Sequence, residues 1–260
     1  MSRNKFYRLI VMLCLCSIFL GDRFGQYAQA KSSDFVIVKG VLTQYKGKSK
    51  KVTIPKSVKS IGDRAFYNCE YITSVVIPKT VKSVGDGAFS GCKNLAKISI
   101  PKTLKSFGAH PFFDTKWSNN RMENDMFLIV NGVLLGADSK KQTEELIIPK
   151  GVKIVNQASF NYWTGIESVT IPEGVEKIGN IAFMMCENLR SVSISNTVTS
   201  IEDGAFSDCY NLKSITLTKD TTFIGEGAFR ACTSLTIYCP KNSYAQKYAK
   251  TNDIPYEIIK

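Results

Sequence analysis

The chain has 260 residues, of which 44% are hydrophobic and 22% are charged, and it contains 18 Gly and 8 Pro. This composition is typical of a globular protein, and it excludes a disordered chain, a collagen-like chain and a protein with many membrane spans. The formal net charge is +12, and the excess is uneven: residues 31–124 hold 17 Lys and Arg against 6 Asp and Glu, whereas residues 125–260 hold 13 against 15. A polyanion would therefore meet the N-terminal half first.

Residues 1–30 have the features of an export signal. Three basic residues precede an apolar run of 12 residues (9–20), and small residues stand where a signal peptidase reads them, at Ala28 and Ala30. A membrane anchor would need about 20 apolar residues. We therefore expect a secreted or cell-surface protein whose mature chain starts at residue 31 and has no transmembrane segment.

Beyond residue 50, three markers recur with a spacing of 23 residues and a single gap of 48. They are an Ile-Pro pair or its equivalent, a Phe that usually follows Ala, and a Cys three positions after that Phe in five of the seven units. The Phe marker stands at Phe66, Phe89, Phe112, Phe160, Phe183, Phe206 and Phe229. A period in the twenties indicates a solenoid, in which each unit buries its apolar face only against its neighbours.

Each unit can be interpreted physically. Alternating apolar residues predict a short strand, which ends at proline because proline has no N–H to donate to the next rung. A second extended segment follows, and then Gly-Asp and a brief helical turn that carries Ala-Phe. Asp63, Asp86 and Asp203 occupy a position from which a carboxylate could cap that turn.

The pattern I-P-x-x-V-x-x-I-G-x-x-A-F-x-x-C-x-x-L, as at residues 77–95, resembles the BspA-type leucine-rich repeat. The resemblance covers about residues 50–240, and units three and four depart from it at Pro111 and Asn156. It implies a β-rich α/β solenoid: a right-handed leucine-rich repeat coil with short strands, extended convex segments and short helical turns. BspA-like proteins are typically secreted or surface proteins associated with adhesion, so the resemblance implies a binding role.

Two related segments explain the gap in the repeat. Residues 35–42 match residues 127–134, and both have the apolar–Gly–apolar character of a β-hairpin. We expect an N-terminal hairpin cap over 31–50, repeats 1–3 over 51–115, an inserted hairpin over 116–145 on an unbroken solenoid, and repeats 4–7 over 146–237. A C-terminal cap over 238–260 would contain a short amphipathic helix (243–250) and an extended tail.

The sequence offers little for catalysis or metal binding. The single histidine, His110, has no partner at triad spacing and is interpreted as a surface turn residue. The acids recur once per turn, where a structural role explains them, and each turn supplies too few oxygen ligands for Ca²⁺. We expect no enzyme activity, no cofactor and no metal.

The cysteines favour burial over cross-linking. Stacked strands lie about 4.8 Å apart, more than the roughly 3.8 Å between Cβ atoms in a relaxed disulfide, so the repeated cysteines should be buried thiols. Cys232 and Cys239, at the end of the stack, are the one pair for which a disulfide is considered.

Two surfaces are candidates for binding. The lysine columns comprise Lys56, Lys79 and Lys102 in one column and Lys59, Lys82 and Lys105 in the other. The hydroxyl face comprises outward strand positions, among them Lys97, Ser99, Ser168, Thr170, Ser191 and Ser193. The alternatives are an edge made soluble by lysine and ordinary solvent-facing strand residues.

These observations predict an exported, non-enzymatic protein that binds an extracellular protein or glycan through many weak contacts, with adhesion as its purpose. The alternative is a cell-envelope component that holds an anionic polymer on the lysine columns. No nucleic-acid partner is expected, because no aromatic stacking platform is interleaved with the basic residues and the export signal points outside the cell. We expect a monomer.

Overall fold

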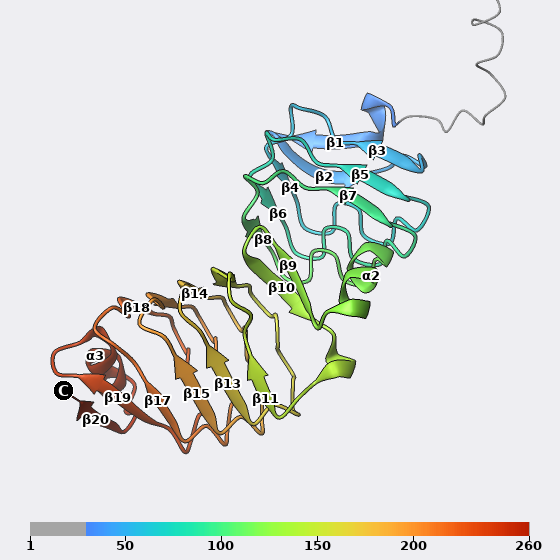
Figure 1. The fold of residues 1–260 in the computed structure, drawn as a ribbon. Coiled ribbons are helices and arrows are strands. Elements are labelled where there is room, and N and C mark those ends of the chain that lie inside the picture. Colours follow the sequence, from blue (N-terminus) through green and yellow to red (C-terminus); the bar gives the residue numbers. More distant parts are fainter. Residues whose placement is uncertain (1–29, 260) are drawn as a thin grey trace, which may run out of the picture.

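The computed structural model describes residues 30–259. Short parallel strands form a solenoid in two stacks that meet near the middle of the chain (Figure 1). We call residues 31–115 the N-terminal stack and residues 126–259 the C-terminal stack. The export signal predicted over residues 1–30 lies outside the described residues, apart from Ala30.

The N-terminal stack contains two sheets. The first has the strand order β1-β2-β4-β6-β8 and consists of β1 (Phe35–Val38), β2 (Val41–Tyr45), β4 (Ser60–Ile61), β6 (Ser83–Val84) and β8 (Ser106–Phe107). The second consists of β3 (Lys51–Thr53), β5 (Ser74–Val76) and β7 (Lys97–Ser99). Only the β1–β2 hairpin is antiparallel; the repeat strands pair in parallel at intervals of 23 residues, as in Ser60↔Ser83↔Ser106.

The C-terminal stack repeats this plan. Its first sheet has the order β18-β16-β14-β12-β10-β9 and consists of β9 (Phe127–Val130), β10 (Val133–Ala137), β12 (Ile154–Val155), β14 (Lys177–Ile178), β16 (Ser200–Ile201) and β18 (Phe223–Ile224). Its second sheet consists of β11 (Glu145–Ile147), β13 (Ser168–Ile171), β15 (Ser191–Ile194), β17 (Ser214–Thr216), β19 (Thr236–Pro240) and β20 (Tyr256–Ile259). Two 3₁₀ turns, η1 (Ser32–Asp34) and η2 (Ser139–Lys141), precede β1 and β11. The predicted leucine-rich repeat coil, with a hairpin at its start, is confirmed.

The end of the C-terminal stack is closed by α3 (Tyr244–Thr251) and β20. Ser243 accepts a hydrogen bond from the Gln246 N–H at 3.2 Å and so caps α3. The buried face of α3 covers the last coil, where Tyr248 lies edge-on to Phe229 at 6.1 Å between ring centroids. The predicted C-terminal helix cap is confirmed.

The expectation of an unbroken solenoid is wrong. Within residues 30–259 no strand of one stack pairs with a strand of the other, and each stack has its own core. The β9–β10 hairpin lies between these cores: Leu128 and Leu135 belong to the N-terminal core, while Leu134 belongs to the C-terminal core and Phe127 packs against it. Because successive strand residues point to opposite faces, a continuous apolar run can serve two cores at once.

A helix that the repeat pattern did not indicate joins the two stacks. α2 (Lys116–Asn124) begins after Thr115, whose hydroxyl accepts a hydrogen bond from the Ser118 N–H at 3.1 Å. Its buried Trp117 packs edge-on against Phe112 at 5.0 Å between ring centroids. α2 therefore covers the last aromatic ring of the N-terminal stack.

The repeated phenylalanines form a ladder through each core. Phe183 and Phe206, for example, are stacked with centroids 5.2 Å apart and an interplanar angle of 2°. The ladder stops at the joint, where Phe112 contacts Trp117 and Phe160 contacts Trp163 at steep angles. Parallel strands in register impose this stacking, because equivalent side chains of successive coils point the same way.

The Gly-Asp pair links successive coils. The Asp63 carboxylate accepts a hydrogen bond from the Asp86 N–H, one repeat later, at 2.8 Å, so it does not cap a turn of its own unit as expected. Asp86 and Asp203 repeat this contact toward Ala109 and Glu226. The glycine is required by packing: a Cβ on Gly85 would lie 2.2 Å from Asp63 Oδ1. The Ala-Phe segment that follows is a run of turns, whereas the α-helices of the described chain lie outside the repeats.

Candidate binding surfaces

The column of Lys59, Lys82 and Lys105 stands along the first sheet of the N-terminal stack. Each lysine immediately precedes a strand (β4, β6 or β8), and these strands pair in register. The Lys82 N–H donates to the Lys59 carbonyl at 2.8 Å, which places the two lysines on adjacent coils. All three side chains are exposed.

The column of Lys56, Lys79 and Lys102 is set by a repeated turn. In each coil the proline carbonyl accepts a hydrogen bond from the N–H three residues later, at 3.0 to 3.1 Å, and the lysine follows the proline directly. The same turn in three successive coils places the three exposed lysines at equivalent positions. The structure therefore brings the six predicted lysines into two parallel rows, one lysine per coil.

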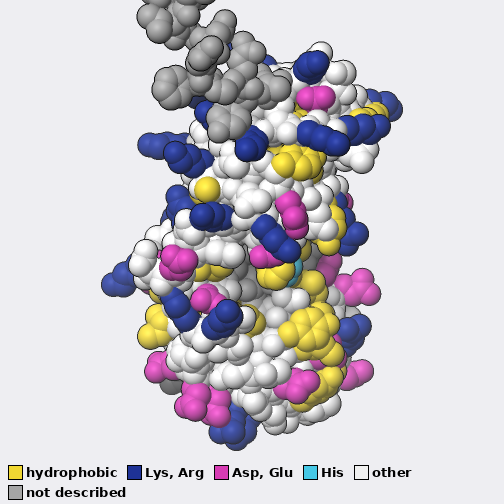
Figure 2. All heavy atoms as spheres, turned by 90° about the vertical axis from the view of Figure 1, so that its right-hand side faces the viewer, with side chains coloured by type: hydrophobic (Ala, Val, Ile, Leu, Met, Phe, Trp, Pro, Cys, Tyr) yellow, Lys and Arg dark blue, Asp and Glu magenta, His cyan; other side chains and the backbone are white. Residues whose placement is uncertain are grey.

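The lysine columns carry positive charge that no ion pair within the described chain neutralises. None of the six forms an ion pair with a residue of the described chain, whereas Lys93, off the columns, pairs with Glu70 at 3.5 Å. In the view of Figure 2, Lys and Arg side chains gather over the part of the face nearest the N-terminus, and acidic side chains are more frequent beyond it. Ammonium groups about 4.8 Å apart in water repel each other by about 0.9 kcal/mol per pair.

In the C-terminal stack the corresponding positions lose this charge. Lys150 and Lys153 are exposed and continue the two columns, but Glu173 and Glu176 follow one repeat later. Lys153 and Glu176 form an ion pair at 3.5 Å. Both partners are more than half exposed, so the pair contributes little to stability, but it neutralises the row.

The hydroxyl face runs along the second sheet of each stack. Parallel pairing aligns Ser168 with Ser191, and Thr170 with Ser193, on adjacent coils of the C-terminal stack. Lys97 and Ser99 lie on β7 of the other stack, at the end of the second sheet, so the joint separates them from the serine rows. The hydroxyls of the aligned residues make no side-chain hydrogen bond with the described residues, and they form rows of short polar groups along the sheet.

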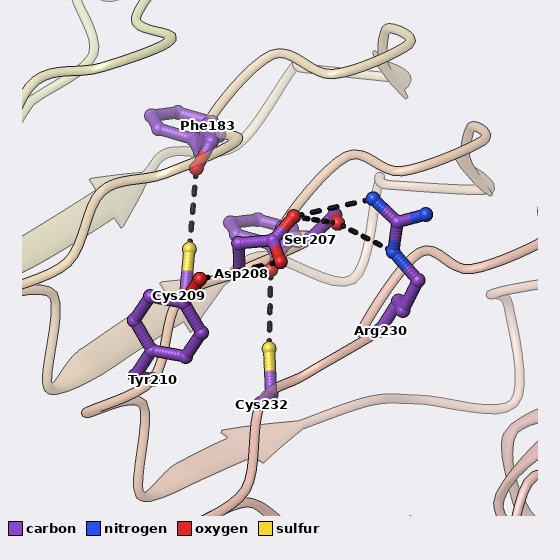
Figure 3. Close-up of polar contacts among 8 residues, drawn as sticks. Phe183, Ser207, Asp208, Cys209, Tyr210, Arg230 and Cys232 are labelled. Atoms are coloured by element: carbon purple, nitrogen blue, oxygen red, sulfur yellow. Dashed lines mark hydrogen bonds and ion pairs between the residues drawn. The ribbon is translucent and has the colours of Figure 1, made fainter.

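The cysteine position of the repeat is a hydrogen-bonding position (Figure 3). The thiols of Cys92, Cys186, Cys209 and Cys232 each donate to the carbonyl of the Phe in the preceding coil, with S···O distances of 3.0 to 3.3 Å. All six cysteines of the described chain are free and buried. The disulfide considered between Cys232 and Cys239 is not formed: the Cys232 thiol points to the preceding coil, while Cys239 is in β19.

A polar cluster beside these thiols also links coils (Figure 3). The Asp208 carboxylate accepts hydrogen bonds from the Ser207 hydroxyl and from Arg230 of the next coil, and these bonds, Ser207 first, lower the pKa of Asp208. Arg230 is 70% exposed, so the pair resembles other weak surface ion pairs. The side chains of this cluster hydrogen-bond one another, so we assign the cluster no ligand.

His110 is not the plain surface residue that the sequence suggested. Its half-buried ring lies at the joint and lines the same cavity wall as Asn161 of the C-terminal stack. Burial lowers the pKa of His110, and this outweighs the opposing influences of Asn161 and Asp86. Asp86 itself crosses the joint by accepting a hydrogen bond from Gln157 Nε2 at 2.7 Å. The Asp86–Gln157 hydrogen bond therefore helps to hold the two stacks together beside His110.

No group of three or more His, Cys, Asp or Glu side chains within residues 30–259 could hold a metal ion. Among the same residues, no helix is long and apolar enough to cross a membrane.

The repeats agree with a known family model. The model of the BspA type leucine rich repeat region matches residues 43–143 and 136–252, in 6 copies. The chain belongs to the BspA-type leucine-rich repeat family. The lysine columns and the hydroxyl face thus stand on a BspA-type coil, and the irregular joint between residues 108 and 163 is where this chain departs from the repeat.

Several solved structures are similar to this BspA-type chain. The T. pallidum leucine-rich repeat protein is 23% identical, with coverage of 88% of this chain and 98% of that chain and a TM-score of 0.37. A leucine-rich cell surface protein from Faecalibacterium prausnitzii is 17% identical, with coverage of 89% and 95% and a TM-score of 0.46. The pneumococcal vaccine antigen PcpA is 18% identical, with coverage of 81% and 79% and a TM-score of 0.37. No curated protein matches the chain. Likenesses of this degree carry no information on function.

Proposed function

We propose that this chain is an exported, non-enzymatic binding protein that engages an acidic macromolecule through the lysine columns of its N-terminal stack. The observation that carries the proposal is the set of six exposed lysines, aligned on three successive coils and without an ion pair in the described chain. Like charges in rows cost free energy unless solvent or an anionic partner screens them. The purpose we infer is adhesion at the cell surface, by contact with an acidic face of an extracellular protein.

The regular spacing of the columns favours a second candidate, an anionic polymer of the cell envelope. Each coil presents two lysines, and successive coils are about 4.8 Å apart, so a linear polyanion could lie along both rows at once. A folded protein partner would present its carboxylates in a less regular pattern. On this alternative, retention at the envelope would be the purpose of the charge.

The test is binding of residues 31–260 to immobilised polyphosphate and to purified extracellular-matrix proteins, at low and high salt. One variant changes the six column lysines to Gln. A matched control changes six exposed lysines outside the columns (Lys31, Lys46, Lys48, Lys213, Lys219 and Lys241) to Gln and so has the same net charge. We expect the column variant to bind about tenfold or more weakly and the control to bind nearly normally, because local charge dominates over net charge at physiological ionic strength.

The outcomes separate the two candidates. Salt-sensitive binding to polyphosphate, lost in the column variant, supports the polymer. Binding to a matrix protein that is lost in the column variant supports adhesion. Equal loss in both variants, or no loss in either, would show that the columns only solubilise the coil.

A further inference from the structure

A cavity of about 500 Å³ lies at the joint between the two stacks. Five parts of the chain form its wall: the turn at residues 110–114, α2, Leu128 of β9, the end of β10 with the start of η2, and residues 159–163 of the first repeat beyond the hairpin. This volume is within the range of pockets that hold small ligands, and such pockets favour places where structural units meet. The interruption of the repeat creates this cavity, since α2 and the hairpin occupy the place of a regular coil.

The wall presents an aromatic surface to solvent. Phe113 is 65% exposed, and the His110 ring stands edge-on to it at 6.0 Å between centroids. Buried Phe112 and Trp163 are among the other apolar residues of the lining. A ligand that covered Phe113 would gain about 25 cal/mol for each Å² of apolar surface removed from water.

Several polar side chains beside this aromatic surface have no hydrogen-bond partner in the described chain. The side chains of Asp114, Asn119 and Glu123 line the cavity and make no hydrogen bond or ion pair with the described residues. They supply carboxylate and amide acceptors together with an amide donor. The groups come from the turn and from α2, so they frame one side of the opening.

The charge of the lining selects against anions. Among the lining residues, Asp114, Glu123 and Asp138 carry negative charge and Lys140 carries positive charge, while the Lys141 ammonium group donates to the carbonyls of Met122 and Glu123 beside them. The carboxylates are also not gathered into a cluster that could hold a metal ion within the described chain, so a compact cation finds no focused site. These features together fit a neutral ligand that is rich in hydroxyls and has an apolar face.

We propose that this cavity binds a neutral oligosaccharide of about two or three sugar units. The apolar face of one sugar ring would pack on Phe113, and its hydroxyls would hydrogen-bond Asp114, Asn119 and Glu123. The site is separate from the lysine columns and needs no charge on the ligand. The carboxylates could instead attract a cationic peptide side chain, and the experiment distinguishes this occupant.

The experiment measures binding to residues 31–260 by calorimetry and by saturation-transfer NMR. The probes are maltotriose, cellotriose and diacetylchitobiose as neutral sugars, arginine amide as a cation, and glucose 6-phosphate as an anion. Two variants test the site: Phe113→Ala removes the aromatic surface, and Asn119→Trp fills the cavity from an exposed position of α2. Tyr67→Ala is the matched control, since Tyr67 is 51% exposed and occupies the position of Phe113 two repeats earlier.

We expect at least one neutral sugar to bind, with affinity reduced about tenfold or more in both cavity variants and unchanged in Tyr67→Ala. The column variant with six Gln should bind the sugar normally, which separates this proposal from the proposed function. Absence of binding by every neutral sugar, sugar binding that survives both cavity variants, or binding of arginine amide alone would overturn the proposal. Thermal unfolding of each variant verifies that it is folded.

Discussion

The lysine columns should lower the stability of the free protein, and this can be measured without knowing the partner. Each column contains two neighbouring pairs of ammonium groups on adjacent coils. At about 4.8 Å in water, each pair costs at most about 0.9 kcal/mol. Lysine side chains can splay apart, so we expect the six Gln substitutions to raise the free energy of unfolding by about 1–2 kcal/mol at low salt.

Salt should remove most of this gain. The Debye length falls from about 30 Å at 0.01 M to about 3 Å at 1 M, which screens neighbouring lysines almost completely. Urea unfolding is the suitable assay, because urea carries no charge and leaves ionic strength unchanged. The column variant should have a higher urea midpoint than the parent at 0.01 M NaCl and nearly the same midpoint at 1 M.

The matched control with six other lysines changed to Gln isolates the effect of position. It lowers net charge equally but removes no aligned pairs, so its gain at low salt should be smaller. A column variant that is less stable than the parent would refute the reasoning, because the lysine side chains would then contribute packing or hydrogen bonds. A gain that persists at 1 M NaCl would refute it too, because unscreened repulsion could not be its source.

Three further predictions concern the coil itself. Gly85→Ala should destabilise the fold by about 1–3 kcal/mol, because its Cβ would clash with the Asp63 carboxylate. In a double-mutant cycle with Asp63→Ala, the loss of stability in the double variant should be smaller than the sum of the two single losses. Full additivity would exclude the clash. Burial raises the pKa of the Cys92 thiol to about 12, so iodoacetamide at pH 8 should label none of the six thiols of residues 31–260 until urea is added. Dithiothreitol should leave the Tm unchanged, because there is no disulfide to reduce. Labelling of the native protein, or a Tm that dithiothreitol lowers, would contradict the assignment of free, buried thiols. The pKa of His110 is lowered in the folded protein, so the unfolded chain binds more protons and stability should fall as pH drops below about 6.5. In urea titrations at several pH values, His110→Gln should reduce this dependence of the unfolding free energy on pH. An unchanged dependence would assign it to other groups.

Much of the coil could be predicted because its causes are local and repeated. A strand that ends at proline, a Phe that faces inward and a Cys three residues later recur in phase, so neighbouring coils must stack equivalent residues. The lysine columns follow from the same register: residues 23 apart in sequence must lie on adjacent coils. The pattern predicts that each Asp caps a turn of its own unit, whereas the structure shows that its carboxylate accepts a hydrogen bond from the next coil. Sequence proximity could not distinguish these two N–H groups, because stacking brings the next coil equally close.

The joint could not be derived in this way. The gap of 48 residues and the departures at Pro111 and Asn156 indicated irregularity there, but they did not indicate α2 or the end of the strand ladders. Apolar runs in the β9–β10 hairpin are compatible with one buried face or with two. Phe113, Asp114 and Asn119 carry no repeat signal, so their common cavity became visible only in three dimensions.

The sequence by itself determined the period, the family, the order of hairpins and repeats, and which residues align along the coil. These features depend on contacts between adjacent coils, which can be inferred because the same residues recur in each repeat. Only the tertiary structure decided that the coil consists of two stacks with separate cores, that the second hairpin lies between them, and that a cavity remains where they meet. Those features depend on how two faces of one hairpin divide between two cores, and this is set by packing over long sequence separations rather than by any local pattern.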